Sequence, residues 1–232
     1  MASNRTVLRL VGVFCAVLFS LGLVANAEAA LVSRLNGQAV YDTDFNITWL
    51  ANANLAASNT FGVSGIAGSG AMDWGTAQSW ISAMDSANYL GYSDWRLPTT
   101  LQPDATCGSQ SSGASFGISC TGSEMGHLFY NELGGTAGTS ILTSHNSFLD
   151  LFSNVQSDIY WSGTDYALTP GYAWVFGFSA GVQDGAYKSG SFLNAWAVRP
   201  GDIAAVPIPA AAWLFGSGLL GLFGLTRRRK IR

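Results

Sequence analysis

The central part of this 232-residue chain has very few basic side chains. Residues 31–205 hold four lysines and arginines against thirteen aspartates and glutamates, a formal charge of −9, compared with −3 for the whole chain. A strongly acidic surface repels polyanions, which argues against nucleic acids and anionic membrane surfaces as partners. Neutral glycans and cations remain compatible with it. The four basic residues are Arg34, Arg96, Lys188 and Arg199.

Histidine is also scarce, with only His127 and His145 in the whole chain. Glu124 and His127 have the E-x-x-H spacing of a di-iron site, but that site needs a second copy of the motif. The sequence contains no second copy. We therefore interpret Glu124 and His127 as a pair on a helix surface.

The acidic residues form no complete calcium or catalytic motif. Asp42, Asp44 and Asn46 begin like a calcium-binding EF-hand loop. Ile47 stands where that loop requires glycine, and Ala53 stands where it requires a bidentate glutamate. No G-x-S-x-G frame supports a catalytic serine. We predict no metal ligands, no cofactor and no enzymatic activity, although a carboxylate pair for glycoside hydrolysis depends on a spatial separation that sequence does not reveal.

Three cysteines are present, and their positions indicate one disulfide. Cys15 lies in the N-terminal segment described below, which leaves Cys107 and Cys120 as an even pair in an oxidising compartment. They flank a loop rich in glycine and serine. Closing a loop of this length stabilises the fold by about 3 kcal/mol in the chain-entropy description.

The N-terminus has the three parts of a secretory signal peptide. Arg5 and Arg9 precede an apolar run over residues 10–24, and small residues then alternate through residues 25–30. We predict a signal peptide over residues 1–29, cleaved near residues 27–30. Export through the inner membrane follows from this prediction.

The C-terminus combines a proline motif, an apolar run and a basic cluster. The apolar run over residues 210–225 is 16 residues long, which is short for a permanent membrane span. The basic cluster should stay on the cytoplasmic side of the membrane. The proline motif comprises Val206, Pro207, Pro209 and Ala210, and the basic cluster Arg227, Arg228, Arg229 and Lys230.

This three-part order resembles the PEP-CTERM sorting signal of Gram-negative bacteria over residues 206–232, in its V-P-x-P-A variant, because Ile208 stands where glutamate gives the motif its name. The resemblance implies recognition by an exosortase-type sorting enzyme. A plain membrane anchor is the alternative.

The segment between the two ends is predicted to be an α+β domain. Apolar residues recur with helical period from Asp73, a good N-cap, over about 16 residues. A second helix is expected from a capping box formed by Thr121 and Glu124, ending at Gly134. Short strands are expected near residues 40–41 and 47–50. A later hairpin should join residues 173–178 to residues 182–187.

Four motifs in order give this domain a family resemblance: D-x-x-x-N-I-T-W-L (42–50), D-W-R-L-P-T (94–99), Y-W-S-G-T (160–164) and A-W-A-V-R-P (195–200). They resemble the Lcl C-terminal domain family, a domain of unknown function in bacterial surface proteins, and we assign residues 31–203 to it. The resemblance implies a C-type-lectin-like fold with two helices and a twisted antiparallel sheet. Its motif residues, which we expect to be structural, are Trp95, Arg96, Pro98, Trp161, Trp196 and Arg199.

Both arginines among these motif residues should hold carboxylates or backbone carbonyls in bidentate pairs. The best-known relative in the family is an adhesin for sulfated glycans, but this sequence shows no basic groove. Surface aromatics such as Tyr166, Tyr172 and Tyr187 are binding candidates that sequence alone does not rank.

These features together predict an exported, exosortase-sorted protein of a Gram-negative bacterium with a structural or glycan-binding role and no enzymatic activity. It would pass through an inner-membrane intermediate, held by its tail before processing, to the cell envelope or extracellular matrix. The expected partners are an exosortase-type enzyme and an extracellular polysaccharide or glycan, with no nucleic acid. The alternatives are a permanently anchored adhesin and a carbohydrate-active enzyme on a lectin-like scaffold.

Overall fold

The structure is a computed structural model that describes residues 30–203 of the chain. The predicted signal peptide (1–29), transmembrane helix (210–225), sorting motif (206–210) and basic cluster (227–230) lie outside the described residues. Within residues 30–203, no helix combines the length and apolar character needed to cross a membrane.

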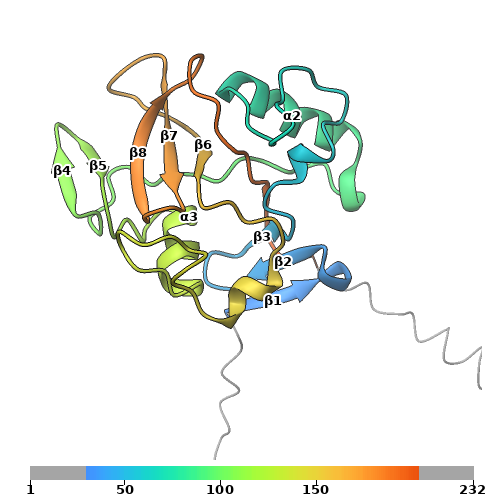
Figure 1. Cartoon of the computed structure of the whole chain (residues 1–232), viewed down its shortest axis with the longest axis horizontal. Helices are drawn as coiled ribbons and strands as arrows, with labels where there is room; N and C mark the ends of the chain where they lie inside the picture. The colour runs from blue at the N-terminus through green and yellow to red at the C-terminus, as the bar shows by residue number, and fades with distance from the viewer. Residues whose placement is uncertain (1–29, 204–232) are drawn as a thin grey trace, which may run out of the picture.

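An antiparallel four-stranded sheet contains both the first and the last strand of the described residues (Figure 1). Its order is β1 (Leu31–Arg34), β2 (Ala39–Asp42), β3 (Ile47–Leu50) and β9 (Val198–Pro200). The β2–β3 hairpin confirms the two strands predicted around a polar turn, where Asn46 takes a left-handed conformation with φ of 51°. Strand β1 was not predicted, because only Leu31 among its four residues is fully buried and no alternating pattern results.

The longest helix of the described residues, α2 (Trp74–Ser86), confirms the prediction from apolar period. The Asp73 carboxylate accepts a hydrogen bond from the Thr76 N–H at 2.7 Å, which satisfies one of the free donors at the helix start. The buried face consists of Ala77, Trp80, Ile81 and Met84.

The second helix differs from its prediction. It consists of α3 (Glu124–His127) followed directly by a π-helical turn, η4 (Leu128–Glu132). Its N-cap is Ser123, so the predicted capping box at Thr121 is wrong. The reason is that the Glu124 carboxylate binds Arg96 and the Thr99 N–H instead of returning to the helix start.

A second antiparallel sheet holds β6 (Ile159–Asp165), β7 (Tyr172–Gly177) and β8 (Val182–Tyr187) in that order. The β7–β8 pair confirms the hairpin predicted around residues 180–181. A small hairpin of β4 (Ser109–Ser111) and β5 (Ala114–Phe116) lies beside β8 and is enclosed by the Cys107–Cys120 disulfide, as predicted. Short 3-10 turns complete the chain: η1 (Leu35–Gly37), η2 (Leu55–Ala57), η3 (Tyr89–Gly91) and η5 (Ser147–Leu151).

The core between these elements is built around tryptophan. Trp196 is fully buried and its ring contacts Trp49 at a centroid distance of 5.1 Å and Tyr160 at 5.7 Å. Its indole N–H donates to the Leu50 carbonyl at 2.7 Å, so the polar end of the ring is also satisfied. The buried motif tryptophans Trp95, Trp161 and Trp196 therefore lie in the core. Antiparallel sheets and two short helices give the predicted α+β class.

Candidate functional site

Arg96 and Arg199 form the bidentate pairs expected from sequence. Arg96 donates to both Glu124 carboxylate oxygens at 2.8 and 2.6 Å. Arg199 donates to both oxygens of Asp94 at 2.8 and 2.9 Å. Beside the first pair, Pro98 leads into the segment whose Thr99 N–H binds the same Glu124 carboxylate. These motif residues connect separate parts of the fold.

The other two described cations also pair with carboxylates. Arg34 binds both oxygens of Asp202, and the Lys188 ammonium binds Asp165. All four basic side chains of residues 30–203 therefore have an acidic partner, and the described surface presents no cluster of basic residues. This arrangement does not suit an anionic ligand.

Tyr172 and Tyr187 form an exposed aromatic pair where β7 begins and β8 ends. They lie directly opposite each other in the strand register, and their ring centroids are 5.6 Å apart. Their exposed fractions are 37% and 49%. Tyr166 lies beside them, because its N–H donates to the Tyr172 carbonyl and its ring packs 4.5 Å from Trp174. We call Tyr166, Tyr172 and Tyr187 the tyrosine surface.

Two glycines allow the rings of the tyrosine surface to lie against the backbone. A Cβ atom at Gly190 would lie 2.8 Å from the Tyr187 ring, and one at Gly185 would lie 3.0 Å from the Tyr166 ring. Any side chain at these positions would displace the ring. The rings therefore contact the backbone directly, and this contact limits the positions open to them, which reduces the entropy lost on binding.

Polar groups border the tyrosine surface. The Asp165 side chain is 68% exposed and pairs with Lys188, whose ammonium lies 4.3 Å from the centre of the Trp74 ring. A pocket of about 90 Å³ opens between the β6–β7 loop and the β4–β5 hairpin. Asp165, Tyr166, Leu168 and Trp174 line it on one side, and Gln102 and Gly113 on the other. Aromatic rings and hydrogen-bonding groups therefore meet in this pocket, to which Tyr166 contributes from the tyrosine surface.

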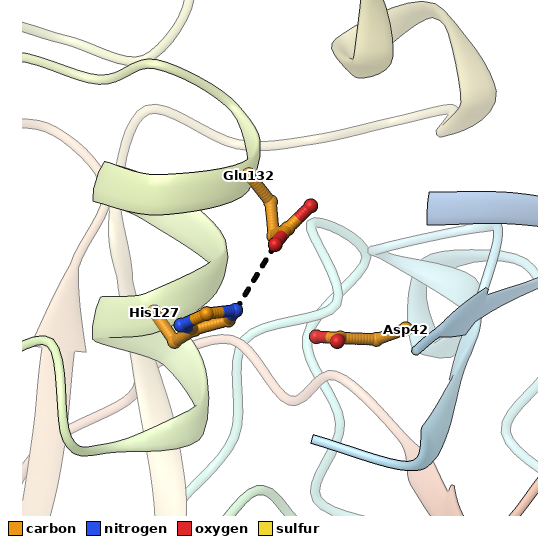
Figure 2. Close-up of side chains that lie close together, drawn as sticks. All are labelled: Asp42, His127 and Glu132. Carbon is orange, nitrogen blue, oxygen red and sulfur yellow. Dashed lines mark hydrogen bonds and ion pairs between the residues drawn. The ribbon is translucent and has the colours of Figure 1, made fainter. Parts of the chain in front are cut away.

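A second candidate site is a buried cluster of Asp42, His127 and Glu132 (Figure 2). Asp42 ends β2, His127 ends α3 and Glu132 ends η4. Nε2 of His127 lies 3.0 Å from Oε1 of Glu132. One donor atom from each of the three residues lies within 4.8 Å of the others. The exposed fractions of Asp42, His127 and Glu132 are 0%, 7% and 4%.

The π-helical turn is what places Glu132 beside His127. In a regular α-helix, residues five apart lie about 140° away from each other around the axis, so they face different directions. The wider η4 turn, in which the Leu133 N–H binds the Leu128 carbonyl, brings residue 132 back over residue 127. Such turns are rare and are often found at functional sites.

The surroundings of the cluster orient its side chains. The Phe45 ring lies 4.3 Å from the His127 ring and holds the imidazole against the β2–β3 turn. Oδ1 of Asp42 accepts hydrogen bonds from the N–H groups of Asp44 and Phe45, both at 3.0 Å. Burial raises the pKa of Asp42, and the nearby Glu132 carboxylate raises it further, whereas the two N–H groups and His127 lower it.

The sequence interpretation did not bring these three residues together. We expected Glu124 and His127 to form a surface pair, but both are buried and they face different partners. Asp42 appeared only as the start of an incomplete calcium loop. The signal for the cluster is a histidine and a glutamate five residues apart, a spacing that indicates a shared face only if the helix contains a π-turn.

Comparison with known proteins identifies the family of this domain. The sequence model of the Lcl C-terminal domain family matches residues 38–199, more than half of the chain. A comparison with curated proteins gives no match.

Proposed function

The chain belongs to the Lcl C-terminal domain family, and we propose that it is an exported, non-enzymatic domain that binds a neutral glycan through its tyrosine surface. The observation that carries this proposal is the exposed pair of Tyr172 and Tyr187 beside Tyr166. A sugar ring has an apolar C–H face and a rim of hydroxyl groups. Aromatic rings with polar neighbours match both parts.

The rigidity of the surface favours binding. A tyrosine offers a large amphipathic contact area with few rotatable bonds, so little side-chain freedom is lost when a ligand docks. Gly185 and Gly190 bring the backbone against two of the rings and reduce that freedom further. The exposed carboxylate of Asp165 supplies hydrogen-bond acceptors for sugar hydroxyls at the edge of the same surface.

The charge of the domain supports a neutral ligand rather than a sulfated one. Residues 31–205 carry a formal charge of −9, and every described cation is already paired with a carboxylate. A sulfated or uronic-acid polymer would meet like charge over most of this surface. We therefore propose an uncharged polysaccharide of the envelope or extracellular matrix as the partner.

The location of the protein belongs to the same proposal. The Cys107–Cys120 disulfide supports an oxidising compartment, and the V-P-x-P-A motif with its basic cluster supports sorting by an exosortase-type enzyme at the inner membrane. The presence of the first and last strands in one antiparallel sheet supports a C-type-lectin-like fold. The intact mass of the protein from its native host tests the sorting step. A mature form that still carries residues 227–232 would refute it.

Glycan binding is tested with a panel of neutral oligosaccharides, with heparin as the sulfated comparison. The protein is expected to bind at least one neutral glycan and not heparin. Tyr187→Ala and Tyr172→Ala should each weaken binding about tenfold, the effect of losing one buried aromatic contact. Leu142→Ala removes an equally exposed apolar side chain outside the tyrosine surface and should leave binding unchanged.

Two outcomes contradict the proposal. Absence of binding across the neutral panel would refute the glycan-binding role. Unchanged binding by both tyrosine variants would show that the glycan binds another surface. A third measurement separates binding from catalysis. Incubation with a bound oligosaccharide should generate no new reducing ends, and hydrolysis would favour a carbohydrate-active enzyme instead.

A further inference from the structure

The buried cluster contains a carboxylate oxygen without a partner. Oδ1 of Asp42 accepts two backbone N–H groups, but Oδ2 has no hydrogen-bond partner although Asp42 is fully buried. Figure 2 shows the Asp42 carboxylate pointing across the gap between β2 and the helix, toward His127 and Glu132. Buried acceptors of this kind are normally satisfied, so this atom points to a ligand between the three side chains.

The cluster places two carboxyl groups beside one imidazole. Asp42 and Glu132 share a site from which water is largely excluded, and carboxylate charge buried there needs a counter-charge. The four basic side chains of residues 30–203 pair with Asp202, Glu124, Asp165 and Asp94, outside the cluster. Buried charges normally have partners or coordinate a metal, and a divalent cation would balance this charge.

The distances suit a small metal ion. Bonds of about 2.0–2.2 Å to imidazole nitrogen and carboxylate oxygen place neighbouring ligands of a tetrahedral ion roughly 3.4 Å apart. The donor atoms here lie within 4.8 Å of one another, and the Nε2–Oε1 distance between His127 and Glu132 is 3.0 Å. Small rotations of the side chains reach the required spacing.

We propose that Asp42, His127 and Glu132 bind one Zn²⁺ ion. An imidazole nitrogen combined with two carboxylate oxygens is a donor set typical of zinc, whereas calcium and magnesium prefer oxygen ligands alone. Zinc also binds such mixed sites more tightly than manganese or ferrous iron. This site is separate from the tyrosine surface and does not depend on the proposed glycan.

Asp44 is the exposed acidic residue next to the cluster. Its Oδ2 lies 3.8 Å from Nε2 of His127, and its side chain is 57% exposed. The fourth position on the ion would therefore face Asp44 and water. The ion would join the β2–β3 hairpin to the π-helical turn, since its ligands come from both.

The experiment measures metal binding directly. Full-length protein without a histidine tag is freed of metal with a chelator and titrated calorimetrically with ZnCl₂, and separately with CaCl₂. We expect one Zn²⁺ per chain and weaker binding of Ca²⁺. Asp42→Asn and His127→Gln should each weaken Zn²⁺ binding by at least about tenfold, because each removes a direct ligand. His145→Gln is the matched control, since His145 bonds the Ile141 carbonyl outside the cluster, and it should bind as the unmodified protein does.

A second measurement avoids substitutions that could prevent folding. The chain has only two histidines, so NMR of the unmodified protein should show Zn²⁺ shifting the ring signals of His127 and leaving those of His145 in place. Absence of Zn²⁺ binding up to about 1 mM, which marks negligible affinity, would overturn the proposal. Full-strength binding by folded Asp42→Asn and His127→Gln variants, or loss of binding in His145→Gln, would overturn it equally.

Discussion

Replacement of Glu124 by glutamine should destabilise the protein more than replacement of any surface carboxylate. The Glu124 side chain is 8% exposed and accepts three hydrogen bonds, two from Arg96 and one from the Thr99 N–H. Hydrogen bonds to a charged group contribute about 1.5–3 kcal/mol each in favourable settings, and removal of one partner from a buried ion pair costs about 3–5 kcal/mol.

The exposure of Arg96, the partner of Glu124, reduces the loss of stability expected for Glu124→Gln. The Arg96 side chain is 33% exposed, so its guanidinium can regain water when the carboxylate is lost. The glutamine oxygen can still accept from Thr99, but its NH₂ group then faces the donors of Arg96. We therefore expect a loss of about 2–3 kcal/mol in the free energy of unfolding, below the cost of breaking a fully buried ion pair.

Urea unfolding followed by tryptophan fluorescence measures this loss. The matched control is Asp202→Asn, which removes a carboxylate from the more exposed Arg34 pair and should cost less than about 1 kcal/mol. If Glu124→Gln and Asp202→Asn lower the free energy of unfolding by the same amount, the Arg96–Glu124 pair does not stabilise the contact between the D-W-R-L-P-T segment and the second helix. A double substitution with Arg96→Met should recover part of the loss, because the half-buried guanidinium that has lost its carboxylate is then absent.

Three further perturbations test other parts of the fold. Reduction of the Cys107–Cys120 disulfide should lower the free energy of unfolding by about 3 kcal/mol, and an unchanged urea midpoint would contradict this. Gly126→Ala should cost about 3 kcal/mol or more, because its Cβ would lie 1.8 Å from the Cys120 carbonyl oxygen, and near-native stability of that variant would show that the turn before α3 can move. Burial raises the pKa of Tyr160, so the stabilisation from its neutral form is present below pH 10 and lost as the pH rises toward the raised value, by up to about 1.4 kcal/mol per unit. Tyr160→Phe should show a shallower alkaline decline in thermal unfolding temperature, and an unaltered slope would refute this.

The parts of the fold that follow from local sequence were predicted, and those that follow from long-range pairing were not. The N-cap of α2 and the β7–β8 hairpin depend on neighbouring residues, so the spacing of Asp73 and the apolar period were sufficient. Strand β1 forms through its pairing with β2, and the residue pattern of β1 alone is too weak to indicate a strand.

The candidate sites also divide into features that local sequence indicates and features that depend on long-range packing. Arg96 and Arg199 were expected to bind carboxylates or backbone carbonyls, because cations are rare among many acids, but the sequence did not indicate that Glu124 and Asp94 are the partners. His127 was expected on a helix surface because the sequence contains no second copy of the E-x-x-H motif. The π-turn depends on packing around α3, which no local pattern reports, and it decides which residues meet His127.

The last strand would have a mechanical consequence under the proposed function, in which the tail holds the domain at one end and a glycan binds the tyrosine surface. In Figure 1 the β1–β2–β3 sheet lies at the opposite side of the molecule from the loop between β6 and β7. Tension between the C-terminal end of the described chain and a ligand on the tyrosine surface would reach the domain through β9. Beyond Pro200, the Gly201 N–H binds the Asn46 carbonyl, its own carbonyl accepts from Thr48, and Asp202 pairs with Arg34. These three contacts would resist the force before the short β3–β9 ladder is pulled, so the proposed attachment would depend first on them when it is under load.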